Sequence, residues 1–245
     1  MRNIKLTIEY DGTNYAGWQR QKDVKTIQQK IEEAIKSITG ESLEVIGASR
    51  TDAGVHARGF VANFKTDSLI PVEKLKPAIN TKLPEDIVIV NAEEVSEDFH
   101  SRYSSKGKLY SYTIINKPDP IAIGRNYAYY YKKELNYEAM QVACKYFIGK
   151  HDFAAFKSTG SSVKTSIRTI SKAYLTKEEH KITFFVEADG FLYNMVRIIV
   201  GTLIDVGLGK ISPESIPDII KSRNRNKAGK TVPAGGLCLE FVYYN

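Results

Sequence analysis

The segment 48–59, ASRTDAGVHARG, combines an aspartate, a histidine and two arginines with two glycines. It lies between two stretches that are typical of strands, and it is longer than the turn that closes a plain hairpin. Asp52 could be an Asx-turn residue, which is the ordinary role of an aspartate in such a loop. Arg50 and Arg58 lie on either side of it in the sequence, however, and neighbouring cations favour the ionised carboxylate. Because an ionised carboxylate can act as a nucleophile or as a base, Asp52 is the first catalytic candidate.

Asp52 and His56, four positions apart, could also be two ligands of a metal site. No further cluster of Cys, His, Asp or Glu completes a coordination sphere, and the chain has only four histidines. Cys144 and Cys238 lie far apart, without the spacing of a zinc site or of a disulfide framework. We therefore expect no metal, and we expect His56 to support the segment. A metal-dependent hydrolase built on Asp52 and His56 stays an alternative, which chelator sensitivity would favour.

The apolar stretch 191–207, FLYNMVRIIVGTLIDVG, predicts a long helix with Asn194, Arg197 and Gly201 along one stripe. An arginine among so many apolar residues must reach solvent or find an anionic partner. The ordinary outcome is a side chain that extends to the surface. The other is an ion pair with a carboxylate from the first half of the chain, for which Asp52 is the natural candidate.

Three aromatic residues could contact a nucleobase. Tyr110 and Tyr112 project from the same face of a predicted strand, where most such pairs pack in a core. In a protein that binds nucleic acid, a tyrosine can instead stack on an extruded base and contribute roughly 1–3 kcal/mol. Trp18, the lone tryptophan, lies in a turn-rich loop and either stacks on a base or braces that loop.

The composition indicates a folded protein with a polyanionic partner. The chain has 245 residues, a formal net charge of +7 and 42% hydrophobic residues, enough for a sizeable core. Residues 221–230, KSRNRNKAGK, hold five cations and no acid, which is typical either of a loop that follows phosphates or of a solvated loop. No stretch has the pattern of a signal peptide or of a membrane span, so we expect a cytoplasmic protein.

The periodicity of the first half predicts strand, helix, strand, strand, helix, strand, which is the ferredoxin-like order. The expected elements are residues 3–12, 26–40, 43–49, 59–66, 71–83 and 86–95. The second half repeats this order, without sequence identity, in residues 108–117, 136–149, a hairpin at 169–190, 191–207 and 236–245. We expect an α+β protein with two ferredoxin-like domains, residues 1–105 and 106–245. Their strands are expected to join into one continuous, mainly antiparallel sheet with helices on one side.

Five motifs, in order and over nearly the whole chain, carry a family resemblance. They are YDGTNYAGWQRQ, SRTDAGVHA, DFHSRYSSKGKLYSY, ADGFLYNMVRIIVGTLIDVG and PAGGLCLEFVYY. Together they closely resemble the TruA family of tRNA pseudouridine synthases. The commonest form of the second motif begins with Gly-Arg, whereas this chain has Ser49-Arg50, a difference that changes none of the reactive groups.

The resemblance implies that Asp52 is the catalytic aspartate, that Arg197 is its basic partner and that Tyr110 stacks on the target uridine. It further implies a homodimer that isomerises uridines at positions 38, 39 and 40 in the tRNA anticodon stem-loop, without cofactor or metal. We expect an RNA-binding cleft. The substrate-binding candidates are Tyr110, Arg50, His56, Arg58 and Arg102.

The chemistry of the isomerisation explains why these residue types are needed. The bond from ribose C1′ to N1 breaks and a bond from C1′ to C5 forms, with no change of redox state. Asp52 could attack the base or act at the sugar, and the base that removes the C5 proton could be Tyr110 or a water molecule. A non-catalytic RNA-binding protein is the main rival, because basic loops and ferredoxin-like sheets suit RNA-binding modules as well.

Overall fold

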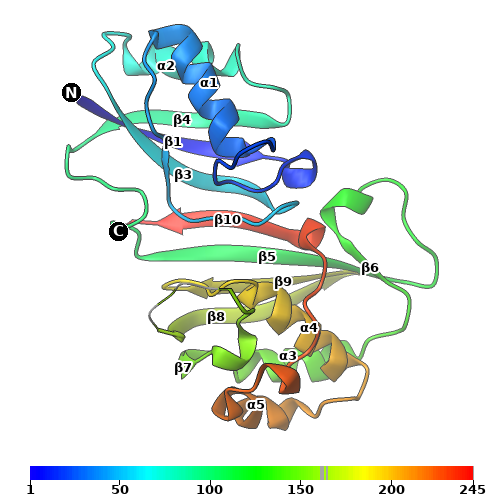
Figure 1. Cartoon of the computed structure of the whole chain (residues 1–245). Coiled ribbons are helices and arrows are strands. Elements are labelled where there is room, and N and C mark those ends of the chain that lie inside the picture. Colours follow the sequence, from blue (N-terminus) through cyan, green and yellow to red (C-terminus); the bar gives the residue numbers. More distant parts are fainter. Residues whose placement is uncertain (161–162, 164, 245) are drawn as a thin grey trace. The chain divides into compact units, whose positions relative to one another are not determined.

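The computed structural model describes residues 1–160, 163 and 165–244 (Figure 1). The chain forms two compact units. Unit 1 comprises Met1–Lys106 and the chain from Cys238 on, and unit 2 comprises Gly107–Leu237. Each unit has a sheet and helices, and the expected α+β class is confirmed.

The sheet of unit 1 contains β1 (Arg2–Tyr10), β2 (Ile46–Gly47), β3 (His56–Thr66), β4 (Ile87–Val95) and β10 (Leu237–Tyr243). Its order is β4-β1-β3-β10, and β2 also pairs with β3. The pairs β1–β3, β1–β4 and β2–β3 are antiparallel, whereas β10 pairs with β3 in parallel through Cys238 and Leu239. The alternating apolar side chains of β1, Ile4, Leu6 and Ile8, are fully buried, as expected for a strand that covers a core with one face.

The helices of unit 1 are α1 (Ile27–Thr39) and α2 (Val72–Asn80), which pack against each other beside the sheet (Figure 1). The hydroxyl of Thr26 caps α1 by accepting a hydrogen bond from the amide of Gln29. Gly40 ends the helix at a φ of 77°, a left-handed conformation that favours glycine. The sequence predicted both ends of α1.

The sheet of unit 2 contains β5 (Gly107–Asn116), β6 (Tyr129–Tyr131), β7 (Gly149–Asp152), β8 (Ile167–Glu178) and β9 (Lys181–Ala188). Its order is β5-β9-β8-β7, with antiparallel neighbours throughout, and β6 adds in parallel to β5. The predicted hairpin is β8–β9, which reverses at Glu179 and His180.

The helices of unit 2 are α3 (Tyr137–Lys145), α4 (Met195–Gly207) and α5 (Ile216–Ser222). Eleven of the thirteen residues of α4 are buried, so this helix is covered on nearly every side. Only Arg197 and Asp205 keep partial exposure. Among the described residues, none of the helices is both long and apolar enough to cross a lipid bilayer.

Several elements differ from the sequence expectation. The strand expected at 43–49 is reduced to Ile46–Gly47, and β6, β7 and α5 were not predicted. The helix expected from residue 191 begins at Met195, because Asn194 has a φ of 61° and is not helical. The closing strand, expected in the second domain, groups with unit 1, so the observed division differs there from 1–105 and 106–245. One continuous sheet and an RNA-binding cleft stay predictions.

Candidate active site

Asp52 begins a tight turn in unit 1. The amide of Val55 donates to the carbonyl oxygen of Asp52 at 3.1 Å, and Gly54 takes a φ of 77° at the third position, as a type II turn requires. The preceding residue, Thr51, is buried and anchored twice. Its hydroxyl is hydrogen-bonded to that of Tyr10 at 2.8 Å, and its carbonyl oxygen accepts from the amide of Trp18 at 3.1 Å. The half-buried Asp52 is therefore presented by a backbone that is fixed on both sides.

The loop 11–18 packs directly on this turn. Gly17 has a φ of 95°, and a Cβ atom there would collide with the carbonyl oxygen of Thr51 and touch the backbone of Asp52. The amide of Gly54 donates to the carbonyl oxygen of Tyr15 at 3.4 Å. This close approach explains why the motifs around residues 10–21 and 49–57 occur together, since one braces the backbone of the other.

Trp18, the last residue of this loop, anchors it in the core of unit 1. Its ring is 2% exposed and stacks on Phe60 with ring centroids 4.0 Å apart. Gly47, opposite, leaves room for the indole, because a Cβ there would collide with it. Of the two roles that the sequence left open, this burial supports the bracing role.

His56 is buried at the start of β3, directly after the turn. Its Nδ1 atom lies 3.0 Å from the amide nitrogen of Gly12 and 3.1 Å from Oδ1 of Asp11. The side chain thus ties the turn to the loop 11–18. A contact between His56 and substrate stays a prediction.

The three other cationic candidates of unit 1 are exposed. Arg58 donates from Nη1 to Oε1 of Glu240 at 2.6 Å, and this bond raises the pKa of the guanidinium. Arg102 lies over the ring of Tyr103, with its guanidinium carbon 5.8 Å from the centroid. Arg50 has no ion-pair partner within the described part of the chain, so its charge is available to a ligand.

Ser49, the residue that departs from the commonest form of the motif, has a buried hydroxyl. Its Oγ atom has no hydrogen-bond partner among the described residues. A buried hydroxyl without a partner is destabilising, because it has lost its hydrogen bonds to water. The segment that leads into the turn carries this cost, three residues before Asp52.

In unit 2, Arg197 projects from the first turn of α4 and is held by two bonds. Its Nε atom donates to the carbonyl oxygen of Val232 at 2.8 Å, and its Nη1 atom donates to Oδ1 of Asn194 at 2.7 Å. Asn194 is itself held, because its Nδ2 atom donates to Oγ of Ser158 at 3.0 Å. Two donors on one planar group fix its orientation.

The segment 228–232 covers the polar stripe of α4. Gly201 permits this contact, since a Cβ there would collide with the carbonyl oxygen of Lys230. The amide of Gly229 donates to Oγ1 of Thr202 at 2.9 Å. The predicted stripe of Asn194, Arg197 and Gly201 thus exists, and part of this chain occupies it.

Arg225 holds this segment in place. Its Nη1 atom donates to the carbonyl oxygens of Ala228 at 3.2 Å and Gly229 at 2.9 Å, and its Nη2 atom donates to Oγ1 of Thr231 at 3.3 Å. Arg223 binds Asp152 at 2.8 Å. The amine of Lys230 lies 5.8 Å from the ring centroid of Tyr129. At least three of the five cations of residues 221–230 therefore have partners within unit 2, and a role of this run in following phosphates stays a prediction.

Tyr110 and Tyr112 lie on one face of β5, as predicted for residues two apart in a strand. Tyr110 is 6% exposed and meets Phe191 edge to face, with centroids 5.1 Å apart. Tyr112 is fully buried and donates to the carbonyl oxygen of Pro233 at 2.7 Å. Burial raises the pKa of Tyr112, and the charge of Arg197 partly offsets this rise. The carbonyl oxygens that accept from Tyr112 and from Arg197 belong to the adjacent residues Pro233 and Val232, so both side chains contact the same segment.

In unit 2 the structure thus brings Arg197 and Tyr112 to one segment, through Val232 and Pro233, with Tyr110 on the same face of β5 as Tyr112. In unit 1 it places Asp52, Arg50, His56 and Arg58 on or beside one turn. The pairing of Asp52 with Arg197 stays a prediction. Within residues 1–160, 163 and 165–244, no group of three or more His, Cys, Asp or Glu side chains could hold a metal ion.

Comparisons with known proteins cover both units. Residues 6–104 and 143–245 match the model of a family described as tRNA pseudouridine synthase. The chain is 61% identical to tRNA pseudouridine synthase A 2 of Clostridium perfringens, and 57% identical to tRNA pseudouridine synthase A of both Clostridium acetobutylicum and Acetivibrio thermocellus. Each alignment covers all of this chain and all of the relative. This chain belongs to the tRNA pseudouridine synthase family.

Among solved structures, a chain from "Crystal Structure of a Cbf5-Nop10-Gar1 Complex" aligns with 96% of this chain and 57% of its own length. The TM-score is 0.41 and the identity 11%, a likeness too low to support a conclusion.

Proposed function

We propose that this chain isomerises uridine to pseudouridine in tRNA. The observation that carries the proposal is the half-buried carboxylate of Asp52, held in a tight turn that Thr51, Gly17 and Gly54 fix. A carboxylate on a fixed backbone, two residues after Arg50 in the sequence, suits nucleophilic chemistry, because the backbone needs no rearrangement before it reacts. Family membership over both units, at 57–61% identity to the named relatives, supports the same activity.

The reaction requires one bond to break and one to form at the same ribose carbon. The C1′–N1 bond of the uridine opens while the base stays in the site, the base turns, and the C1′–C5 bond closes. The proton on C5 is then lost and N1 gains one, so atoms and electrons balance without a redox partner. Asp52 supplies the anionic oxygen, either by adding to the base or by acting at C1′.

The residues of unit 2 receive supporting roles in this proposal. Tyr110 contacts the displaced uridine, because an aromatic face offsets the cost of removing a base from the stack. Arg197 keeps the carboxylate ionised by means of its charge. The two hydrogen bonds that hold the guanidinium preset its direction. Arg50, exposed and close to Asp52 in the sequence, contacts the RNA beside the target nucleotide.

The finer points of the proposal concern substrate and assembly. We assign the activity to uridines 38, 39 and 40 in the anticodon stem-loop, and to a homodimer in the cytoplasm that uses neither metal nor cofactor. The support for these finer points is the resemblance of the five motifs quoted above to the TruA family.

Tritium release tests the proposed activity. The purified chain is incubated with a tRNA transcript that carries uridine labelled at C5, in the presence and absence of a chelator, and the product is mapped by primer extension after pseudouridine-specific modification. We expect tritium in the solvent, an intact RNA chain, signals at positions 38–40 and no effect of the chelator. Binding without tritium release would show a non-catalytic RNA-binding protein, and strand cleavage that the chelator abolishes would show a metal-dependent hydrolase.

A further inference from the structure

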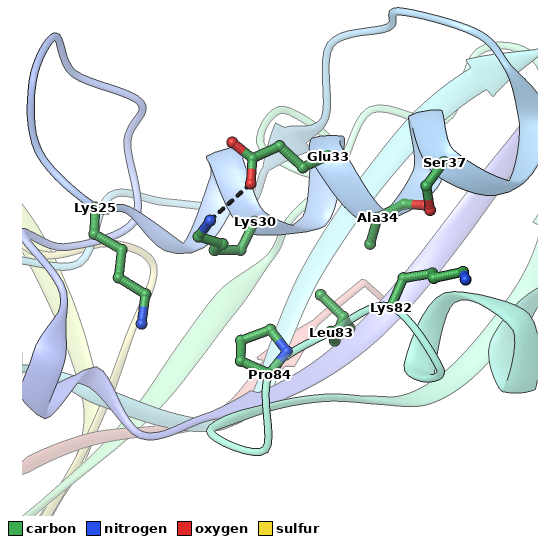
Figure 2. A pocket seen from close by; sticks show the side chains of 8 residues that line it. All are labelled: Lys25, Lys30, Glu33, Ala34, Ser37, Lys82, Leu83 and Pro84. Carbon is green, nitrogen blue, oxygen red and sulfur yellow. Dashed lines mark hydrogen bonds and ion pairs between the residues drawn. The ribbon is translucent and has the colours of Figure 1, made fainter.

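Unit 1 carries a cationic hollow between α1 and the loop that follows α2 (Figure 2). The α1 side contributes Lys30, Ala34 and Ser37, and the loop contributes residues 82–84 with the amine of Lys82. Lys25, just before α1, closes one end. We propose that this hollow binds the phosphates of the tRNA backbone outside the target uridine, an inference that rests on the proposed function above.

A second hollow continues the first. It shares Lys25 and Lys30 with it and adds Arg20 and Lys22. Together the two linings hold five cationic residues against two acids, Asp23 and Glu33. Arg20 is paired with Glu32 at 2.6 Å, which leaves Lys22, Lys25, Lys30 and Lys82 as the cations that set the charge of the surface. An open surface with this excess of positive charge attracts a polyanion that extends over both hollows.

Two lysines have their charge available for a ligand. Lys30 pairs with Glu33 at 2.7 Å, and this partner lowers the pKa of the carboxyl group, so these two charges largely cancel. In contrast, neither Lys25 nor Lys82 has a carboxylate at ion-pair distance among the described residues. Figure 2 shows both amines apart from the Lys30–Glu33 pair.

Both the amine and the backbone of Lys25 are held by contacts within unit 1. Its amine lies over the ring of Tyr15, 4.4 Å from the centroid, and the phenol of Tyr15 is held by a hydrogen bond to Asp86. The carbonyl oxygen of Lys25 accepts from the amide of Ala16 at 2.9 Å, so the backbone is fixed as well. The quadrupole of the ring attracts the ammonium group, which holds the amine at this position.

The loop beneath Lys25 is hydrogen-bonded to the turn that carries Asp52. The carbonyl oxygen of Tyr15, the residue beneath Lys25, accepts from the amide of Gly54, two residues after Asp52. One braced loop therefore connects the positioned lysine with the reactive carboxylate. In this proposal, an RNA whose uridine reaches Asp52 extends its backbone to this loop, where Lys25 contacts a phosphate.

Charge-neutral variants test the surface. The double variant Lys25→Gln/Lys82→Gln is compared with Lys65→Gln/Lys74→Gln, which removes the same charge at exposed positions of unit 1 outside both hollows. For the first pair we expect roughly tenfold weaker binding of a tRNA transcript, and a plot of log K against log salt that is less steep by about 1.5, corresponding to two lost phosphate contacts. The weaker binding should raise KM for tRNA and leave kcat unchanged. If both double variants match the wild type in affinity and slope, the surface does not bind RNA.

Lysine labelling in the unaltered protein gives a second measurement. An amine-reactive reagent is applied to the free protein, to its complex with the tRNA transcript, and to the protein with inorganic phosphate at the same phosphate concentration. We expect the transcript to protect Lys25 and Lys82 but not Lys65, and inorganic phosphate to protect none of them. Equal labelling with and without tRNA overturns the proposal, and protection by inorganic phosphate alone assigns the hollow to a small anion instead.

The outcomes separate the two proposals. A wild-type protein that releases no tritium contradicts the proposed function. An active wild-type protein whose Lys25/Lys82 variant behaves as the Lys65/Lys74 control contradicts only the assignment of this surface.

Discussion

The Nε atom of Arg197 donates to the carbonyl oxygen of Val232 across 2.8 Å, so a residue of α4 and a residue 35 positions later in the chain share one hydrogen bond. The backbone adds a second bond, from the amide of Val232 to the carbonyl oxygen of Arg197 at 3.4 Å. The orientation of the guanidinium thus depends on a segment outside the helix. Substitutions can therefore change the direction of the guanidinium while its positive charge stays.

Arg197→Lys keeps the charge and removes the planar group. A lysine cannot bind Val232 and Asn194 together in the same geometry, so we expect kcat to fall by about tenfold to a hundredfold, as for a misplaced catalytic group. The melting temperature should change little, since α4 stays buried by its apolar residues. Steady-state kinetics on a tRNA transcript check this result. Unchanged kinetics would show that the direction of the guanidinium does not matter.

Arg225→Gln removes the side chain that holds the carbonyl oxygens of Ala228 and Gly229. We expect a lower kcat, because the segment that orients Arg197 loosens, with tRNA affinity and its salt dependence unchanged. Arg225→Lys should restore part of kcat, since an ammonium group can still bind one carbonyl oxygen.

Lys221→Gln is the matched comparison, because Lys221 is exposed in the same basic run. We expect it to reduce the salt dependence of binding and to spare kcat. A salt dependence that falls for Arg225→Gln as it does for Lys221→Gln would contradict the positioning role of Arg225.

Ser49→Ala removes a buried hydroxyl that has no partner in the described chain. We expect the free energy of unfolding to stay level or to rise by up to about 1 kcal/mol. Thr202→Val is the control, because its hydroxyl accepts from the amide of Gly229 and donates to the carbonyl oxygen of Ile198. That variant should lose about 1–3 kcal/mol, since the amide of Gly229 is left without its acceptor. Equal losses in urea unfolding would show that Ser49 also has a partner.

The buried phenol of Tyr112 makes stability depend on alkaline pH. Burial raises its pKa, whereas the same group in the unfolded chain ionises near pH 10. Its contribution is therefore complete below about pH 10 and is lost above it, by up to about 1.4 kcal/mol per pH unit, because the unfolded state then binds fewer protons.

Tyr112→Phe tests this dependence. The variant should be less stable by about 1 kcal/mol below pH 10, where it lacks the hydrogen bond to Pro233, and should lose stability less steeply above it. Urea unfolding between about pH 8 and pH 11 measures both limbs. Parallel curves for the two proteins would contradict the assignment.

Elements whose sequence pattern depends only on neighbouring residues were predicted correctly. Thr26 and Gly40 mark the ends of α1, and the alternation of Ile4, Leu6 and Ile8 marks β1, because a cap or a period of two depends only on nearby residues. The start of α4 could not be predicted. The left-handed conformation of Asn194 accompanies bonds to Ser158 and Arg197, and the first of these partners is distant in the sequence.

The candidate residues could be named from the sequence, whereas the contacts that hold them could not. A run of cations reads the same whether its members face solvent or bind the carbonyl oxygens of their own loop, as Arg225 does. The closing strand has an ordinary strand pattern, and nothing in that pattern indicates that Cys238 and Leu239 pair with β3. Close approaches such as that of Gly17 to Thr51 likewise depend on the folded chain.

Pseudouridine formation by Asp52→Asn tests the central claim most directly. The substitution keeps the shape of the side chain and removes its charge, and the turn from Asp52 to Val55 uses the backbone carbonyl, so the fold should persist. Tritium release from C5-labelled tRNA is measured together with affinity for the same transcript. We expect no release and an affinity within about tenfold of the wild type, because phosphate contacts dominate binding. Measurable pseudouridine from the purified variant would contradict the account.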